Sequence, residues 1–237
     1  MYKQLTRMHP PRILIILTSL ALLLALTSCG GGGSGPPSAQ QLISNAQVAI
    51  QKVTSYHFNL AVDNPGTGAA LVIKSADGDV LVPDKLKANA SALVLSNVVQ
   101  VQIITIGDKE YITDPITGSW MTTTGLLNPR TLSDTRTGVA AILGNIQSPS
   151  VPADSSVDGT PCWSMDGSLD AKYLAGITGG NVAPGTKVSV TTCIGKNDNL
   201  PYLIRMKGVA TTGDTNNTTR TFKLSKFGES VTISAPV

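Results

Sequence analysis

Few side chains in this sequence are suited to covalent chemistry. The chain of 237 residues contains three cysteines, Cys29, Cys162 and Cys193, and two histidines, of which only His57 lies beyond the first ten residues. A thiol can be acylated, can pair with a second thiol, or can act as a nucleophile beside a histidine base. The sequence around each of these residues indicates which of these reactions applies.

The segment before Cys29 is typical of a lipoprotein signal. The first twelve residues contain three basic side chains and no acid, and residues 13–26 are uncharged, which is the pattern of a signal peptide. The apolar run is shorter than the ~20 residues of a membrane span, although a short anchor helix is the alternative. It ends in Leu-Thr-Ser-Cys, which resembles the bacterial lipobox, in which the thiol receives a diacylglycerol.

We therefore predict a signal peptide over residues 1–28, acylation of Cys29 with palmitate-type chains, and a flexible Gly-rich tether over residues 29–37. The expected location is the extracytoplasmic face of the cell membrane, to which the lipid anchor holds the protein. The remaining residues, 38–237, contain no second linker and no internal repeat, so they are expected to form one domain.

Charge argues against nucleic acid as a partner. The chain has 18 basic and 15 acidic residues, and three of the basic ones lie in the predicted signal peptide. The remaining chain is therefore balanced, whereas nucleic-acid binding needs a concentrated basic face. Aromatic residues make up only 4% of the chain. A large domain with so few aromatic side chains either fills its interior with small aliphatic residues or leaves it open.

Cys162 and Cys193 are predicted to form a disulfide. Export places them in an oxidising setting, and their number is even once Cys29 is acylated. A zinc site is not expected because the domain offers one histidine, and no CxxC motif indicates redox activity. We expect no metal and no cofactor.

His57 and three acids are the remaining candidates for catalysis or cation binding. A hydrolase would need His57 as its base, but no G-x-S-x-G motif is present, so a hydrogen-bonded strand residue is favoured. Asp108, Glu110 and Asp114 could serve a glycosidase or Ca²⁺, but their spacing favours an ordinary turn. Trp120 could fill the core or stand at a cavity mouth, and core packing is favoured. No enzymatic activity is expected.

Hydrophobic periodicity predicts an α+β fold with one large antiparallel sheet. Residues 38–53 have helical spacing, with Ser38 and Gln41 placed as a capping box. Short helices are expected within 123–147, capped by Ser133 or Asp134 and running to about Ile146, and a helical turn over 172–177. Strands are expected at 56–63, 69–75, 78–82, 85–94, 98–106, 110–113, 157–168, 186–194, 201–211 and 218–235.

Several stretches resemble the LppX/LprA/LprF/LprG family of actinobacterial lipoproteins. They are VTSYHF at 53–58, YITDPITGSW at 111–120, FKLSKFG at 222–228 and VTISAP at 231–236, and the similarity extends over about 38–236. The resemblance implies a half-open β-barrel, a strongly curved antiparallel sheet wrapped on a few helices, similar to the Lol lipoprotein carriers. It also implies a carrier of lipids or acylated glycolipids that encloses an apolar cavity and could work with a membrane transporter.

Acyl chains need apolar area more than directional contacts, so such a cavity leaves no polar motif in the sequence. The alternative is a tethered structural or protein-interaction module with a filled core, because alternation cannot separate a cavity wall from a packed core. The candidate lining residues lie on the apolar faces of helix 38–53 and of two strands: Leu42, Ala46, Ile50, Phe58, Leu60, Val62, Val99, Val101 and Ile103.

Overall fold

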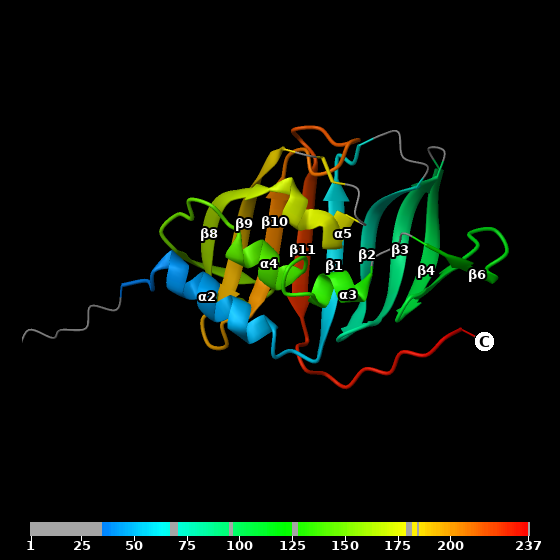
Figure 1. Ribbon diagram of the computed structural model, residues 1–237, viewed down its shortest axis with the longest axis horizontal. Coiled ribbons are helices and arrows are strands. Elements are labelled where there is room, and N and C mark those ends of the chain that lie inside the picture. Colours follow the sequence, from blue (N-terminus) through cyan, green and yellow to red (C-terminus); the bar gives the residue numbers. More distant parts are fainter. Residues whose placement is uncertain are drawn as a thin grey trace, which may run out of the picture. The chain divides into compact units, whose positions relative to one another are not determined.

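A computed structural model describes residues 35–66, 71–94, 97–124, 128–178, 182–183 and 185–236, with the backbone alone at residue 71. Residues 36–237 form one unit (Figure 1). Its helices are α2 (Ala39–Ile50), α3 (Pro129–Ser133), α4 (Val139–Gly144), the 3₁₀ helix η1 (Ala171–Leu174) and α5 (Ala175–Thr178). The predicted signal peptide and Cys29 lie outside the described residues.

The eleven strands of the described residues all belong to one antiparallel sheet. Their order across it is β6-β5-β4-β3-β2-β1-β11-β10-β9-β8-β7, so β6 and β7 form its two edges and the sheet is not closed. The strands are β1 (Ser55–Asp63), β2 (Leu71–Leu81), β3 (Lys85–Val94), β4 (Asn97–Ile106), β5 (Lys109–Thr113), β6 (Trp120–Thr123), β7 (Ala153–Val157), β8 (Thr160–Asp170), β9 (Lys187–Gly195), β10 (Pro201–Lys207) and β11 (Thr219–Ser225).

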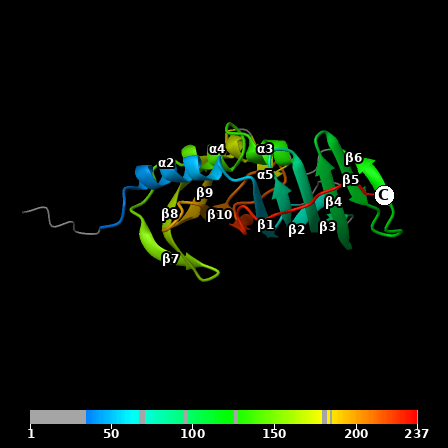
Figure 2. The ribbon, with the colours of Figure 1, turned by 90° about the horizontal axis from the view of Figure 1, so that it is seen from below.

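Figure 2 shows the helices gathered on one side of the curved sheet. Alternate residues of β1 face this side, from Tyr56 through Phe58 and Leu60 to Val62, and all four are buried. Helix α2 begins at the expected place, because the Ser38 hydroxyl accepts the Gln41 N–H at 3.2 Å. The predicted α+β architecture, with an open antiparallel sheet and a few helices, is confirmed.

Strand β2 corrects one expectation. Two strands were expected, at 69–75 and 78–82, but β2 runs unbroken from Leu71 to Leu81. Gly78 lies opposite Phe58 of β1 and Ala88 of β3. A Cβ at Gly78 would lie 2.2 Å from the Lys87 carbonyl oxygen and 2.6 Å from the Ala88 Cα. The glycine therefore permits a close approach of two strands and does not end one.

The predicted strand at 157–168 corresponds to β8, which begins at Thr160, whereas β7, its partner in a hairpin, was not predicted. Strands β7 and β8 meet at Asp158 and Gly159, which both have positive φ, 48° and 86°, and Val157 pairs with Thr160. Positive φ at both central residues is the signature of the two-residue hairpin turn that Asp-Gly favours. The Asp-Gly pair in the sequence could have identified this turn.

The C-terminal strand is shorter than expected. Strand β11 ends at Ser225, and the chain then leaves the sheet through Lys226 and Gly228, which have positive φ. The Gly228 N–H donates to the Ser55 carbonyl oxygen at 2.8 Å, and the Ser55 hydroxyl donates to the Glu229 carbonyl oxygen at 2.5 Å. These bonds hold the first residues of the tail at the start of β1. Strand β10 likewise ends at Lys207 and not at residue 211.

The cap of α4 also differs from the expectation. Its N-cap is Gly138, which has no side chain to bond the first turn, and neither Ser133 nor Asp134 caps it. A Cβ at Gly138 would lie 2.0 Å from the Leu132 carbonyl oxygen. Close packing between α3 and the start of α4 therefore takes precedence over capping at this position.

Candidate ligand-binding site

The nine predicted lining residues come together in one apolar cluster between the sheet and the helices. Eight of them are buried members of this cluster, and Val99 is partly buried against it. They come from the consecutive elements α2 and β1 and, further along the chain, from β4. The structure therefore places these residues on shared apolar faces, as the periodicity predicts.

Small residues occupy the middle of the sheet face that packs against this cluster. Across strands β1 to β4, Phe58 is followed by Gly78, Ala88 and Ile103, and the next row, which starts at Leu60, continues with Ala76 and Ala90. Large side chains thus stand on both sides of a strip that contains only glycine and alanine. Sequence reasoning missed this strip, although alternation of small and polar residues along 85–92 marks it.

The interior around the nine residues is closely packed in this structure. A side chain beside an open cavity keeps surface within reach of a water molecule, whereas Phe58 and Ala46 are 0% exposed and Ile103 is 1% exposed. Protein interiors normally pack in this way. A cavity that accepts an acyl chain therefore stays a prediction, and at these residues it requires the helix layer to move.

The helix layer over this cluster is built from short pieces. Helices α3, α4, η1 and α5 have only four to six residues each. Between α2 and α4, the Gln47 side-chain N–H donates to the Ala140 carbonyl oxygen at 3.0 Å. Helices this short depend on packing for their stability, and residues 139–143 of α4 are all buried.

A small pocket adjoins the cluster where α2 ends and β1 begins. Its volume is about 30 Å³. Two of its lining residues, Tyr56 and Ser133, each carry a buried hydroxyl oxygen without a hydrogen-bond partner. Burial raises the pKa of the Tyr56 phenol far above its ordinary value. The complete lining consists of Ile50, Gln51, Val53, Tyr56, Val82, Leu132, Ser133, Val139 and Ala140.

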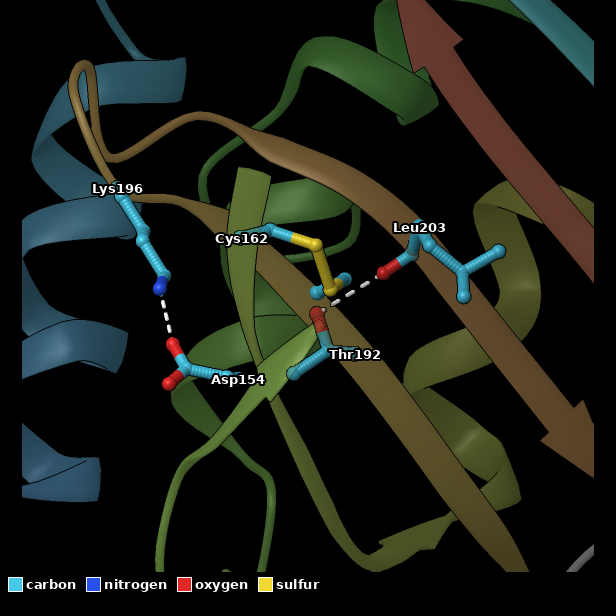
Figure 3. The surroundings of a disulfide bond; sticks show 6 residues. Asp154, Cys162, Thr192, Lys196 and Leu203 are labelled. Atoms are coloured by element: carbon cyan, nitrogen blue, oxygen red, sulfur yellow. Dashed lines mark hydrogen bonds and ion pairs between the residues drawn. A yellow bond between two sulfur atoms is a disulfide. The ribbon is translucent and has the colours of Figure 1, made fainter. Parts of the chain in front are cut away.

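The predicted disulfide between Cys162 and Cys193 is present (Figure 3), with an S–S distance of 2.00 Å and a Cα–Cα distance of 5.6 Å. It joins β8 to β9 and is buried in a separate small cluster with Val157, Tyr202 and Leu203. Closing a loop of this length stabilises a fold by roughly 3–4 kcal/mol on the chain-entropy model. The bridge therefore strengthens the scaffold and takes no part in the apolar interior.

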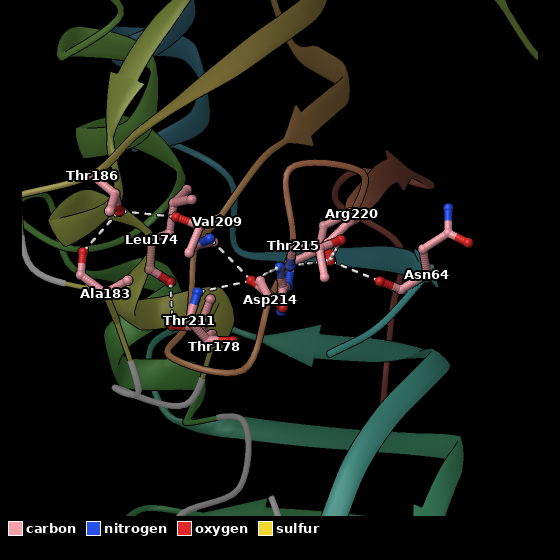
Figure 4. A network of polar contacts seen from close by, with 12 residues as sticks. Asn64, Leu174, Thr178, Ala183, Thr186, Val209, Thr211, Asp214, Thr215 and Arg220 are labelled. Carbon is pink, nitrogen blue, oxygen red and sulfur yellow. Dashed lines mark hydrogen bonds and ion pairs between the residues drawn. The ribbon is translucent and has the colours of Figure 1, made fainter. Parts of the chain in front are cut away.

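A buried ion pair organises the loop between β10 and β11 (Figure 4). The Arg220 guanidinium donates two hydrogen bonds to the Asp214 carboxylate, at 2.6 and 2.9 Å, and the two side chains are 11% and 2% exposed. The carboxylate also accepts the N–H groups of Ala210 and Thr211. Burial alone would raise the pKa of Asp214, but Arg220 and the two N–H groups outweigh it and hold the pKa below its ordinary value.

His57 lies on the opposite face of β1 from Tyr56 and Phe58. Its Nδ1 is 2.8 Å from an Asp79 carboxylate oxygen, and its Nε2 is 3.3 Å from an Asp77 carboxylate oxygen. Among the described residues, no serine or cysteine side chain is hydrogen-bonded to the His57 ring. His57 is therefore a hydrogen-bonded strand residue, as the sequence favoured.

The three acids near residue 110 do not form a joint site. Asp108 pairs with Arg130 at 2.6 Å, and Glu110 is buried on β5. Asp114 accepts the N–H groups of Thr117 and Ile116, which lower its pKa. Within the described ranges, no group of three or more potential ligands could hold a metal ion.

Trp120 is half-buried on the edge strand β6. It is not among the partly buried side chains that pack against the described apolar cluster. The expectation that it fills the core is therefore not supported by its surroundings.

None of the helices in the described residues is long and apolar enough to cross a membrane. No curated protein sequence matches the chain. The fold is similar to two solved structures. LprF from Mycobacterium bovis has a TM-score of 0.68 and 22% identity over 86% of this chain and 99% of that one. LppX from Mycobacterium tuberculosis has a TM-score of 0.60 and 19% identity over 83% and 98%.

At these identities the two structures show a shared fold. The family is shown by the sequence itself, because the family model of the LppX_LprAFG lipoproteins matches residues 38–233. That range begins at the cap of α2 and ends in the tail after β11, so it includes every strand and helix described above. The chain belongs to the LppX_LprAFG lipoprotein family.

Proposed function

We propose that this protein is a lipid-anchored carrier that binds a lipid or acylated glycolipid at the cell envelope. The observation that carries the proposal is the apolar cluster between the inner face of an open sheet and a thin layer of short helices. Membership of a lipoprotein family supports it. The strip of Gly78, Ala76, Ala88 and Ala90 supports it as well, because small residues leave room above them once the helices move.

The mechanism is partition and requires no covalent step. Each CH₂ group transferred from water to an apolar interior contributes about 0.8 kcal/mol, so an acyl chain binds without a single hydrogen bond. The interior is packed in this structure, so acyl chains would enter as the helix layer shifts relative to the sheet. A membrane transporter is a suitable partner for delivery or collection of the lipid.

The membrane attachment is part of this proposal. Cys29 would carry the diacylglycerol, and residues 30–37, GGGGSGPP, would act as the flexible tether between the membrane and α2. The carrier domain would then begin at Ser38, the N-cap of α2, and work on the extracytoplasmic face of the membrane.

The test is to purify the protein from its own envelope, extract it with organic solvent and identify lipids by mass spectrometry. We expect stoichiometric acylated lipid from the wild type. Ala90→Trp places a large ring on the buried face of β3 and should abolish that signal while the protein stays folded. Asn89→Trp is the matched control, because Asn89 directly precedes Ala90 and is exposed. The Asn89→Trp protein should retain the lipid.

The packed interior favours one rival, a tethered interaction module with a filled core. In that case no lipid co-purifies, and Ala90→Trp overpacks the core at a cost of about 1–3 kcal/mol. A carrier whose interior closes when empty is overpacked by the ring in the same way. Extraction of the wild-type protein therefore separates the two functions: a lipid-free wild type would exclude the carrier.

A further inference from the structure

Two hydroxyl groups are buried without partners at one place in the fold. In the described part of the chain, Tyr56 Oη and Ser133 Oγ are the buried side-chain oxygens that lack a hydrogen-bond partner. Both residues line the same pocket. Buried polar groups are normally hydrogen-bonded, and each exception requires an explanation. Two exceptions that share one pocket point to a group that binds there.

The pocket borders the apolar interior. Tyr56 lies near the start of β1 and Ser133 at the end of α3. Tyr56 itself and four other lining residues, Ile50, Leu132, Val139 and Ala140, also belong to the large apolar cluster. A molecule whose chains occupy the interior could therefore place one of its polar atoms between the two hydroxyls.

The lining determines which polar atom fits. No charged side chain lines the pocket, so a carboxylate or phosphate would be buried without a counter-charge, at a large cost. Because burial raises the pKa of Tyr56, its phenol stays protonated and can donate. The volume of about 30 Å³ exceeds the roughly 10–15 Å³ that one water molecule needs, so a small neutral group fits and a sugar does not.

An ester carbonyl oxygen meets these requirements. It has two lone pairs and can accept from both Tyr56 and Ser133. It brings no donor of its own, so the two hydroxyls alone satisfy it. We propose that Tyr56 and Ser133 together bind an ester carbonyl oxygen of the carried lipid, so that the protein distinguishes acyl esters from alkyl ethers. This inference rests on the proposed carrier function.

The experiment uses two lipids that differ only in their carbonyl groups. Dipalmitoylglycerol and 1,2-di-O-hexadecylglycerol have similar chains and the same free hydroxyl, but only the first has ester carbonyls. We expect the delipidated wild-type protein to bind the diester roughly five- to a hundredfold more tightly, which corresponds to the net contribution of two hydrogen bonds. Binding is measured by competition against a fluorescent fatty acyl probe.

Two variants remove the donors separately. Tyr56→Phe and Ser133→Ala each delete one oxygen, and each should weaken diester binding while diether binding stays within twofold of the wild type. Tyr202→Phe is the matched control, since its hydroxyl donates to Asp198 at 2.6 Å and Tyr202 does not line the pocket. It should keep the full preference. Should Tyr56→Phe fold poorly, Ser133→Ala alone decides the question.

Three outcomes overturn the inference, and they separate it from the carrier function. Equal wild-type affinity for the two lipids would contradict the ester site but not the carrier function. If the protein bound neither lipid, both the ester site and the carrier function would be contradicted. In a crystal structure of the lipid complex, a water molecule bridging Tyr56 and Ser133, with every lipid oxygen elsewhere, would assign the pocket to trapped water.

Discussion

At the scale of single residues, the Asp214–Arg220 pair is the most consequential polar interaction described in this fold. Its two charges are almost completely buried and are joined by two hydrogen bonds. Removing one partner of such a pair leaves an uncompensated charge and typically costs 3–5 kcal/mol. The pair fixes the loop between β10 and β11, which also bonds to the carbonyl oxygen of Asn64 at the end of β1 through Thr218.

We expect Asp214→Asn to lower the free energy of unfolding by about 3 kcal/mol, because Arg220 then stays buried without its counter-charge. Urea denaturation at pH 7 measures the change. Asp108→Asn is the control, since Asp108 also bonds an arginine but is exposed, and exposed pairs contribute about 0–1 kcal/mol. Equal effects of the two substitutions would contradict the importance given to the buried pair.

The same pair predicts acid sensitivity. The pKa of Asp214 is held below its ordinary value in the folded protein, whereas in the unfolded chain it is about 3.9. The stability gained from this shift is complete above the unfolded pKa and is lost as the pH falls through the folded pKa. Wild-type stability should therefore decline below about pH 4, and Asp214→Asn should remove this part of the slope in urea denaturation between pH 5 and pH 2.5.

At the scale of the elements, Gly78 marks a place where β2 and β3 pack closely against each other. We expect Gly78→Ala to destabilise the fold by about 1–3 kcal/mol, because the new methyl group would collide with backbone atoms of β3 and push the two strands apart. Thermal unfolding measures the effect. Asn89→Ala, on the exposed face of β3, should change stability by less than ~0.5 kcal/mol; an unchanged Gly78→Ala protein would mean that the strands separate at little cost.

Elements with a clear period could be predicted from the sequence. The amphipathic spacing of α2, its Ser38 cap and the alternation along β1 each reflect one buried face, so local pattern and tertiary packing agree. Where they disagree, the sequence misleads. The expected break between residues 75 and 78 is absent from β2, and the N-cap of α4 is Gly138 instead of the expected Ser133 or Asp134.

The candidate site could be predicted only in part, for a physical reason. Alternation identifies Phe58, Leu60 and Val101 as inward-facing, but the signal is the same for a packed core and for a lipid compartment. The disulfide could be predicted because pairing follows from export and an even number of thiols. The hydroxyl pair could not, because Tyr56 and Ser133 are distant in sequence and only the fold shows that both lack partners.

At the scale of the whole molecule, we expect Cys29 to serve only membrane attachment and the domain to bind lipid independently of it. Cys29→Ala removes the thiol that the lipid would modify, so the variant should accumulate as an uncleaved or unlipidated precursor of different mass. Detergent partitioning and intact-mass measurement check this. The isolated domain, residues 38–237, should fold and bind lipid without the anchor; a Cys29→Ala protein with wild-type mass and partitioning would contradict the assignment of Cys29.

The open sheet has a further consequence for a protein held at a surface. A lipid tether would confine many copies to a thin layer, and there their effective concentration is far higher than in free solution. Bare strand edges invite edge-to-edge polymerisation, which short strands resist. Here the exposed edges are β6, of four residues, and β7, of five. Because both edge strands are short, the sheet could stay open for its ligand while neighbouring copies lie close together without pairing into fibres.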